Sequence, residues 1–174
     1  AATAQSVAAV EAEFLVEGGI EYGGDELLTV QFTNGDEQVM LAGQGGYVGA
    51  GGQFRFTSLP PLLIRATIGV KYNTTAADNA SISLTRFPVT LMPYYQINED
   101  IRLGVGLSSH QGVQFRGDGY APDESFSGSI SPRIEIGYQW AALTYTLQTY
   151  TPATGTALGA GSIGLNLSYV FPAK

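Results

Sequence analysis

Apolar and polar residues alternate along most of the chain, in segments separated by clusters of turn-forming residues. A period of two is typical of β-strands, and no stretch shows the period of an amphipathic helix. The phase slips near Thr85-Arg86, which indicates a β-bulge. The pattern as a whole predicts eight strands. They cover about residues 12–23, 45–57, 62–73, 82–96, 101–111, 127–140, 141–151 and 161–171.

The connections between these segments alternate between short and long. The long ones are 24–44, 74–81, 112–126 and 152–160, and the others are tight turns. The first long connection holds an additional hairpin, Glu26 to Gly43, because the Asn-Gly pair in Thr33-Asn34-Gly35-Asp36 favours a tight turn. An even number of strands with one trimmed end and one elaborated end is typical of transmembrane β-barrels.

Alternation alone does not state which face of each strand meets the solvent. The polar face is mostly Gly, Ser, Thr, Asn and Gln with a few charges of both signs, and such charges can pair inside a closed barrel. We therefore predict that the apolar face points outward into lipid and the polar face lines the lumen. The predicted lumen ion-pair network consists of Glu13, Glu17, Glu21, Arg55, Arg65, Lys71, Arg86, Arg102, Arg133 and Glu135.

Aromatic residues on the apolar face gather near the trimmed end. Aromatic rings favour the headgroup level of a membrane, so they predict an interfacial girdle on the periplasmic side. The predicted girdle consists of Phe14, Phe54, Phe56, Tyr95, Tyr138, Trp140, Tyr169 and Phe171.

Composition narrows the function classes. The 174 residues predict one domain, 1–174, and no run of about 18 apolar residues indicates a membrane helix. The absence of Cys and the single His argue against a thiolate or His-rich metal site, and we expect no metal and no cofactor. A net charge of −7 argues against a nucleic-acid partner. The opening residues 1–5 are typical of the small residues left after a signal peptide is cleaved, so we expect an exported chain.

The chain resembles the small eight-stranded outer-membrane β-barrels of Gram-negative bacteria, the OmpA, OmpX and OmpW class. The resemblance covers about residues 11–171. It depends on the strand count, on Pro93-Tyr94-Tyr95 before a tight turn and on the aromatic-ended last strand, 165–171. Members of this class end on an aromatic residue, whereas Pro172-Ala173-Lys174 follow Phe171 here. The resemblance implies an all-β, antiparallel, up-and-down transmembrane barrel with a hairpin-extended first extracellular loop.

The resemblance also implies contact with outer-membrane lipid and lipopolysaccharide, and we expect a monomer. The leading hypothesis is a non-enzymatic barrel with a surface-interaction or envelope-structural role. Its best contact element for an extracellular partner is the segment from Leu27 to Leu41, because exposed strands offer edges for pairing. An eight-stranded barrel is filled by its own side chains, so an aqueous pore is not expected.

Three other functions stay open. The first is passage of small hydrophobic molecules through a lateral opening, near the Gly-rich strand 45–57 or near Leu158-Gly161. The second is lipid A deacylation, for which this class uses a His with a Ser two residues later. Here His110 is followed by Gly112 and preceded by Ser108 and Ser109, so we expect no enzyme. The third is a soluble calyx, which requires the apolar faces to point inward.

Two loop features have ordinary explanations. Arg116-Gly117-Asp118 spells an integrin-type tripeptide, but Gly and Asp are also common turn residues. Acidic residues dominate the predicted loops, with Arg116 as the exception, and this indicates a solvated cap. These residues are Asp25, Glu26, Asp36, Glu37, Asp78, Asp118, Asp123 and Glu124.

Overall fold

The part of the chain that the structure describes contains thirteen β-strands. The computed structural model describes residues 10–31, 35–75 and 81–172. Among these residues there is no helix that is long and apolar enough to cross a membrane. The strands are β1 (Val10–Tyr22), β2 (Glu26–Gln31), β3 (Glu37–Leu41), β4 (Gly45–Phe56), β5 (Leu62–Thr74), β6 (Ser83–Gln96), β7 (Ile101–Arg116), β8 (Glu124–Gly128), β9 (Ile130–Tyr138), β10 (Ala141–Thr146), β11 (Thr149–Pro152), β12 (Leu158–Gly159) and β13 (Ser162–Phe171).

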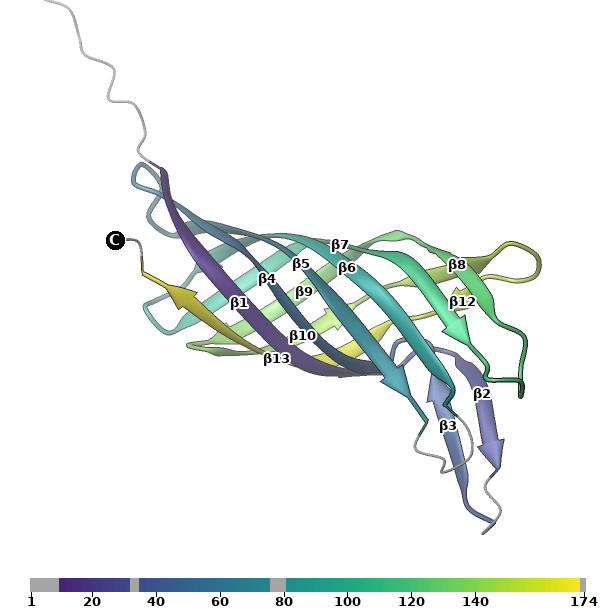
Figure 1. Cartoon of the computed structure of the whole chain (residues 1–174). Helices are drawn as coiled ribbons and strands as arrows, with labels where there is room; N and C mark the ends of the chain where they lie inside the picture. Colours follow the sequence, from purple (N-terminus) through teal and green to yellow (C-terminus); the bar gives the residue numbers. More distant parts are fainter. Residues whose placement is uncertain (1–9, 32–34, 76–80, 173–174) are drawn as a thin grey trace, which may run out of the picture.

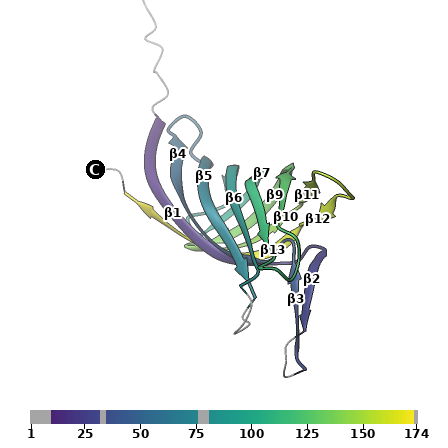
Figure 2. The ribbon, with the colours of Figure 1, turned by 45° about the vertical axis from the view of Figure 1, so that its right-hand side comes forward.

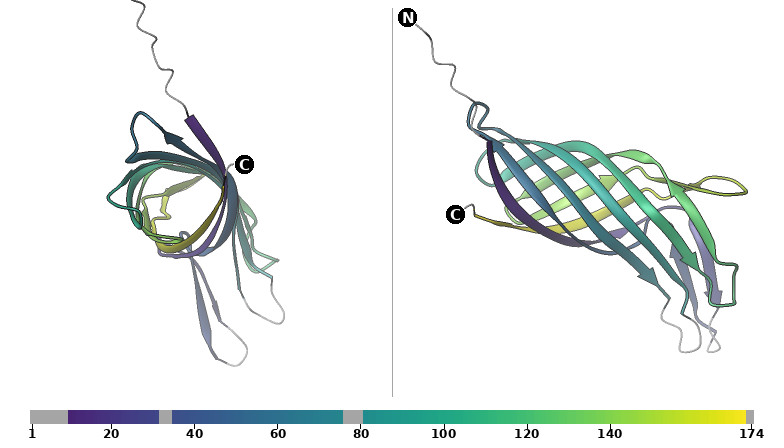
Figure 3. Two further views of the ribbon diagram at one scale, coloured as in Figure 1. Left: turned by 90° about the vertical axis from the view of Figure 1, so that its left-hand side faces the viewer. Right: turned by 45° about the horizontal axis from the view of Figure 1, so that its top comes forward.

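Eight antiparallel wall segments form a closed barrel, which Figure 3 shows nearly end-on. We call each segment, which is one strand or two consecutive strands, a stave. The strands β1, β4, β5, β6 and β7 each form one stave, and the pairs β8–β9, β10–β11 and β12–β13 form the other three. The first stave closes the ring: Glu17 in β1 lies opposite Gly49 of β4 on one side and opposite Ser168 of β13 on the other. Backbone groups along the wall therefore bond to neighbouring strands, as the interior of a bilayer requires. The predicted eight-stranded up-and-down barrel is confirmed.

The two ends of the barrel differ. The tight turns 57–61, 97–100 and 139–140 lie at the end where both described chain ends are found, and we call this the turn end (Figure 1). The hairpin of β2 and β3 and the strands β8, β11 and β12 lie at the opposite end, which we call the loop end. Figure 2 shows that this hairpin extends beyond the barrel wall. The predicted hairpin extension is confirmed, although Thr33 and Asn34 of its tip lie outside the described residues.

The apolar faces of the staves point outward. In β9, Ile134, Ile136 and Tyr138 are 47%, 55% and 58% exposed, whereas Arg133 and Glu135 on the same strand are buried. The same alternation runs through β10, β13 and the part of β7 before Gly112. Soluble proteins rarely expose an apolar patch larger than a few hundred Å², so a belt that surrounds a whole barrel indicates a lipid surface. A soluble calyx requires the opposite orientation, and this hypothesis is wrong.

The predicted bulge lies on a different strand. The side chains of β6 keep one phase throughout, and the irregularity in the β6–β7 ladder comes from an extra residue in β7. At Gly112 the backbone has φ = 53°, a value that favours glycine. Before Gly112 the even-numbered residues of β7 are buried, and after it Val113 and Phe115 are buried instead. The sequence pattern indicates a bulge in β6 because Leu84 points inward and Thr85 points outward, which is the reverse of the usual polarity of these two faces.

The interior changes character toward the loop end. There the inward side chains form an apolar cluster, to which the β2–β3 hairpin contributes Val30 and Met40. The prediction that the polar face lines the lumen is therefore wrong for the loop end. We call this group the upper cluster. It consists of Val30, Met40, Ala42, Ile82, Leu84, Val113, Phe115, Phe126, Tyr150 and Ala160.

The outward orientation of the apolar faces makes a first prediction. Val105 is 64% exposed on β7 at the height of the apolar belt, so Val105→Arg should destabilise the barrel by about 2–4 kcal/mol in lipid vesicles. The reason is the cost of placing a guanidinium in hydrocarbon. Urea unfolding, followed by the mobility of unboiled samples on SDS gels, measures the change.

The matched control is Gln111→Arg, an exposed position on the same strand close to the loop end. It should lower stability by less than about 1 kcal/mol. Equal stability of the wild-type chain and Val105→Arg in lipid would contradict a hydrocarbon environment for this face.

Candidate functional site: the sealed lumen and the loop end

The structure places all ten residues of the predicted ion-pair network on inward positions of the barrel. Glu13, Glu17 and Arg55 are half-buried. The other seven are buried; they are Glu21, Arg65, Lys71, Arg86, Arg102, Arg133 and Glu135. Two neighbouring residues of one strand point to opposite sides of the wall, so these side chains meet although they come from six different staves.

Glu21 is the centre of the charge cluster nearest the loop end. Its carboxylate accepts a hydrogen bond from Arg133 Nη1 at 2.9 Å and pairs with Lys71 Nζ through its second oxygen. The Ser162 hydroxyl donates to the same carboxylate at 2.9 Å. One anion thus neutralises part of the charge of two cations in a space that excludes bulk water.

Two further ion pairs lie closer to the turn end. Arg102 Nη2 lies 3.3 Å from Glu135 Oε1, and its Nη1 donates to the Gln139 carbonyl at 2.5 Å. Arg55 Nε lies 3.1 Å from Glu13 Oε2, at the mouth of the barrel. The ion pairs are therefore distributed along the whole lumen.

Within the described residues, three of the ten network side chains have no ion-pair partner and are stabilised by neutral groups. Arg65 donates to Gln53 at 2.8 Å and to Ser168 at 3.1 Å, and its guanidinium lies 5.3 Å from the centre of the Tyr94 ring. The Glu17 carboxylate accepts hydrogen bonds from Thr67 and Asn166. The third, Arg86, donates to backbone carbonyls.

Lys71 and Arg86 fix the chain where it returns from the hairpin. Lys71 Nζ donates to the Gly43 carbonyl at 2.6 Å, and Arg86 donates to the carbonyls of Ala42 and Gln44 at 2.6 and 2.5 Å. Three consecutive carbonyls are therefore held by two lumen cations. We call this arrangement the carbonyl clamp. No pattern in the sequence indicates the clamp, because backbone acceptors are present at every position.

The side chains close the middle of the lumen. The cavity there has a volume of about 10 Å³ and lies among Glu17, Tyr47, Thr67, Lys71 and His110. A space of this size holds about one water molecule. A wider hollow of about 340 Å³ lies at the turn end among Gln53, Arg65, Arg102 and Ser168, so the lumen is closed at its middle rather than filled throughout.

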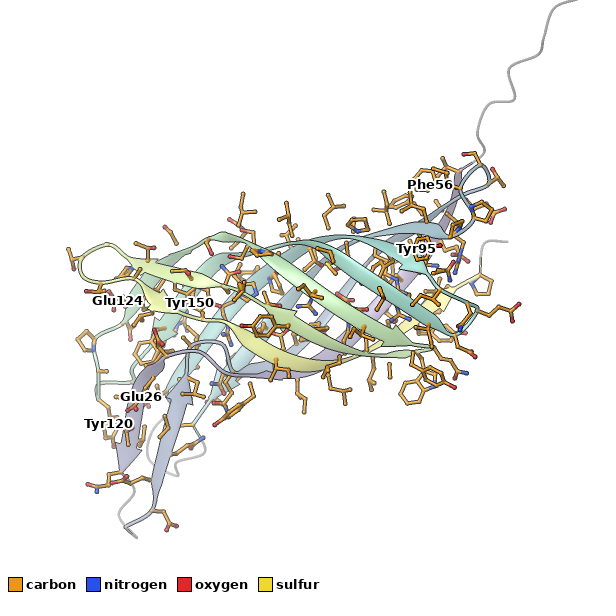
Figure 4. The ribbon with its side chains drawn as sticks, turned by 180° about the vertical axis from the view of Figure 1, so that it is seen from behind. Glu26, Phe56, Tyr95, Tyr120, Glu124 and Tyr150 are labelled. Atoms are coloured by element: carbon orange, nitrogen blue, oxygen red, sulfur yellow. The ribbon has the colours of Figure 1, made fainter. Side chains whose placement is uncertain are left out.

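Aromatic side chains surround the turn end. Phe14 and Phe171 of the neighbouring strands β1 and β13 have ring centres 5.5 Å apart, and Tyr169 packs edge-on against Phe171 at 4.9 Å. Tyr95, Tyr138 and Trp140 are exposed, and Phe54 and Phe56 are half-buried. Figure 4 shows Tyr95 and Phe56 at the same end of the barrel, opposite Glu26 and Glu124.

The barrel has a closed ring of eight staves, an apolar outer belt, short turns at one end and long connections at the other. The chain has the architecture of a small eight-stranded outer-membrane β-barrel. No family model matches the chain, and no curated protein matches it.

Matches among solved structures include Ail, the attachment invasion locus protein of Yersinia pestis. Its crystal structure in complex with the heparin analogue sucrose octasulfate has a TM-score of 0.47 and 13% identity, covering 91% of this chain and 99% of Ail. A second crystal structure of Ail has a TM-score of 0.45 and 10% identity, with 91% and 97% covered. The backbone structure of Ail in a phospholipid bilayer nanodisc has a TM-score of 0.40 and 8% identity, with 91% and 100% covered.

His110 does not form a catalytic arrangement with the neighbouring serines. Its ring is buried, and Nδ1 shares a hydrogen bond of 2.5 Å with the Tyr150 hydroxyl. The Ser108 hydroxyl is buried without a hydrogen-bond partner among the described residues. A nucleophile, a base and an orienting group in contact with one another are required for acyl transfer, and the described side chains around His110 do not provide them.

The Arg116-Gly117-Asp118 segment is part of a turn that is held by hydrogen bonds to two carboxylates. Asp118 has φ = 48°, and its carboxylate accepts the backbone N–H of Ser81 at 2.7 Å. Gly117 donates its N–H to the Asp123 carboxylate at 2.9 Å. Both carboxylates therefore have a structural role. Among the described residues, no three His, Asp or Glu side chains gather as metal ligands.

The triad around Glu21 makes a second prediction. Glu21→Gln leaves Lys71 and Arg133 buried without a carboxylate, and the barrel should lose about 3–5 kcal/mol of stability. The matched control Glu26→Gln removes an exposed carboxylate and should change stability by less than about 1 kcal/mol. Unfolding in urea, with folded barrel counted on unboiled gels, measures both.

Replacement of the whole triad separates charge from packing. Glu21→Leu combined with Lys71→Met and Arg133→Met should recover most of the lost stability, because no uncompensated charge remains. If Glu21→Gln alone is as stable as the wild-type chain, the carboxylate does not neutralise the two cations.

The carbonyl clamp makes a third prediction. Arg86→Met removes the hydrogen bonds to Ala42 and Gln44, so the amides of Ala42 and Gly43 should exchange with deuterium about tenfold faster or more. Arg65→Met, which also removes a buried arginine without an ion pair, should leave their exchange unchanged. Equal exchange rates in Arg86→Met and the wild-type chain would show that the clamp does not hold this segment.

Proposed function

We propose that the chain is a non-enzymatic outer-membrane barrel that acts through its loop end, in surface interaction or envelope support. The observation that carries this proposal is the closed middle of the lumen, where a cavity of about 10 Å³ leaves no room for a solute. The elaborated end is then the part of the molecule that can meet a partner.

The orientation in the membrane follows from the lengths of the connections. Outer-membrane barrels have short periplasmic turns and longer extracellular loops. This rule places the aromatic girdle on the periplasmic side and the β2–β3 hairpin outside the cell. In this orientation the belt contacts outer-membrane lipid, the loop end lies beside lipopolysaccharide, and the exported chain acts as a monomer.

The β2–β3 hairpin is the best candidate contact element. Its inner face packs Val30 and Met40 into the upper cluster, while Thr29 and Val39 are exposed on the other face. The two strands pair with each other and form a separate two-stranded sheet in the described part of the chain. A strand of a partner can add to such an edge through main-chain hydrogen bonds.

Charge selects the kind of partner. The described connections at the loop end carry many carboxylates and, as a cation, Arg116. A basic protein segment is therefore favoured over a polyanion, because opposite charges steer association. Ail is crystallised with a heparin analogue. For this chain we expect no heparin binding. The acidic residues are Asp25, Glu26, Asp36, Glu37, Asp118, Asp123 and Glu124.

The alternative of lateral passage has two candidate places in the wall. A groove of about 530 Å³ on the outer wall lies beside Gly46 and Ile163. Behind it the ladder is continuous, since Glu21 lies opposite Gly45 in β4 and Gly164 in β13. Near Leu158-Gly161 the wall is also joined, because β12 pairs with β11 and Ala160 donates its N–H to the Gln148 carbonyl.

The proposal makes a fourth prediction. In nanodiscs of zwitterionic lipid, the wild-type chain should bind a lysine-rich peptide, and the charge-reversed hairpin Glu26→Lys/Glu37→Lys should bind it at least about tenfold more weakly. The control Glu99→Lys reverses a charge at the turn end, away from the hairpin, and should bind the peptide like the wild-type chain. Biolayer interferometry at low and high salt measures the affinities, and heparin serves as the negative arm.

Flux tests the competing function. Liposomes that contain the chain should take up a small hydrophobic solute no faster than empty liposomes. Faster uptake would contradict the sealed barrel, and peptide binding that is insensitive to the hairpin charges would contradict the loop end as the contact surface.

A further inference from the structure

A polar groove lies on the outer wall of the barrel, immediately above the apolar belt. It has a volume of about 620 Å³ and spans β5, β6 and β7 at the loop end. Below it, Ile68, Val70 and Val89 on the same strands are exposed and apolar. The groove thus begins at the height where hydrocarbon gives way to the headgroup layer.

Two exposed aromatic rings line the groove. Tyr72 of β5 and Phe87 of β6 are 47% and 43% exposed and border the belt. An exposed ring offers its flat, apolar face to a ligand, and the C–H faces of a sugar ring pack on such a surface while its hydroxyls stay free to hydrogen-bond. The rings alone also fit an acyl chain, so the polar lining decides the ligand.

The polar lining offers donors and acceptors of several kinds. Thr85 and Gln114 lie opposite each other in the β6–β7 ladder and supply a hydroxyl and an amide. Arg116 is exposed and has no ion pair within the described residues. Asp118 and Asp123 each accept a backbone N–H with one carboxylate oxygen, which fixes their position. Their second oxygens have no hydrogen-bond partner among the described residues and can accept from a ligand.

The bulge at Gly112 builds this lining. If β7 continued in the phase of its first half, Val113 and Phe115 would point outward, and Gln114 and Arg116 would point into the barrel. The extra residue reverses this: Val113 and Phe115 enter the upper cluster, and Gln114 and Arg116 face the groove. Bulges are frequent where a strand must re-aim a side chain at a functional site.

We propose that this groove binds the sugar headgroup of an outer-leaflet glycolipid, with the rings of Tyr72 and Phe87 under the saccharide. The source is lipid-borne because the groove opens directly onto the lipid-facing belt. Hydroxyls of the saccharide bond to Gln114 and to the free oxygens of Asp118 and Asp123, and Arg116 accommodates an acidic substituent. The inference rests on the proposed orientation, which places this end at the outer leaflet, but not on the hairpin as a contact element.

The test uses the full chain in nanodiscs of zwitterionic lipid and lipid-free core oligosaccharide of lipopolysaccharide as the probe. Wild-type chain should bind it with saturable amide shifts at Thr85 and Gln114 in NMR spectra. Phe87→Ala and Gln114→Ala should each weaken binding about tenfold or more. The matched controls Tyr22→Ala, an exposed ring on β1, and Glu124→Gln should bind like the wild-type chain, and unboiled gels verify that every variant is folded.

Several results would overturn the proposal. These are an absence of saturable shifts, equal loss in Tyr22→Ala and Phe87→Ala, or full competition by inorganic phosphate, which would reduce the site to Arg116 alone. A second arm with lipopolysaccharide in the disc should protect the same amides. If the free oligosaccharide protects these amides and lipopolysaccharide does not, the lipid source is contradicted. Glu26→Lys/Glu37→Lys should bind the oligosaccharide normally, so that failure of the hairpin proposal and failure of the groove proposal are distinguishable.

Discussion

A charged side chain in the middle of the lumen has no bulk water around it, because the wall is a single β-sheet and hydrocarbon lies behind it. Charged groups placed there must be neutralised by one another or by fixed dipoles. Both solutions occur: Glu21 lies between Lys71 and Arg133, and Arg86 is held by backbone carbonyls. The same constraint explains the small cavity, since close packing of long polar side chains satisfies their hydrogen bonds. The sealed lumen is thus a consequence of how the chain stabilises its charges.

The polarity of the wall reverses where the barrel leaves the belt. In the belt, the outward residues are mostly apolar and the inward ones mostly polar, with buried Leu63 and Met92 as exceptions. At the loop end, Val113 and Phe115 point in and Gln114 and Arg116 point out. The reversal is made on β7 by the single residue Gly112. It suits the change of solvent from lipid to water. An apolar interior at this height also gives the β2–β3 hairpin a surface on which to pack, so the hairpin is anchored by burial as well as by the carbonyl clamp.

The parts of this structure that are periodic could be predicted from the sequence. Eight alternating segments, short turns and the Asn-Gly hairpin determined the staves and their order, because a period of two assigns each residue to one face. The bulge was assigned to the wrong strand, since Leu84 and Thr85 disturb the pattern of β6 while the extra residue is Gly112 in β7. The upper cluster, the clamp and the groove combine residues from three or more staves, and no pattern within one strand reports such contacts.

The charges of the chain are distributed unevenly between the lumen and the loop end. Inside, six basic residues meet four acidic ones, so the excess of acidic residues in the whole chain lies outside the lumen. Net charge far from zero favours solubility and selects partners by sign. An acidic loop end beside phosphate-rich lipopolysaccharide is repelled unless contact is made through neutral groups. The groove beneath it offers such contact, with aromatic rings, an amide and a hydroxyl at the headgroup level. Sugar recognition at the wall and protein recognition at the tip are therefore compatible on one barrel, because they use surfaces of different chemistry at different heights.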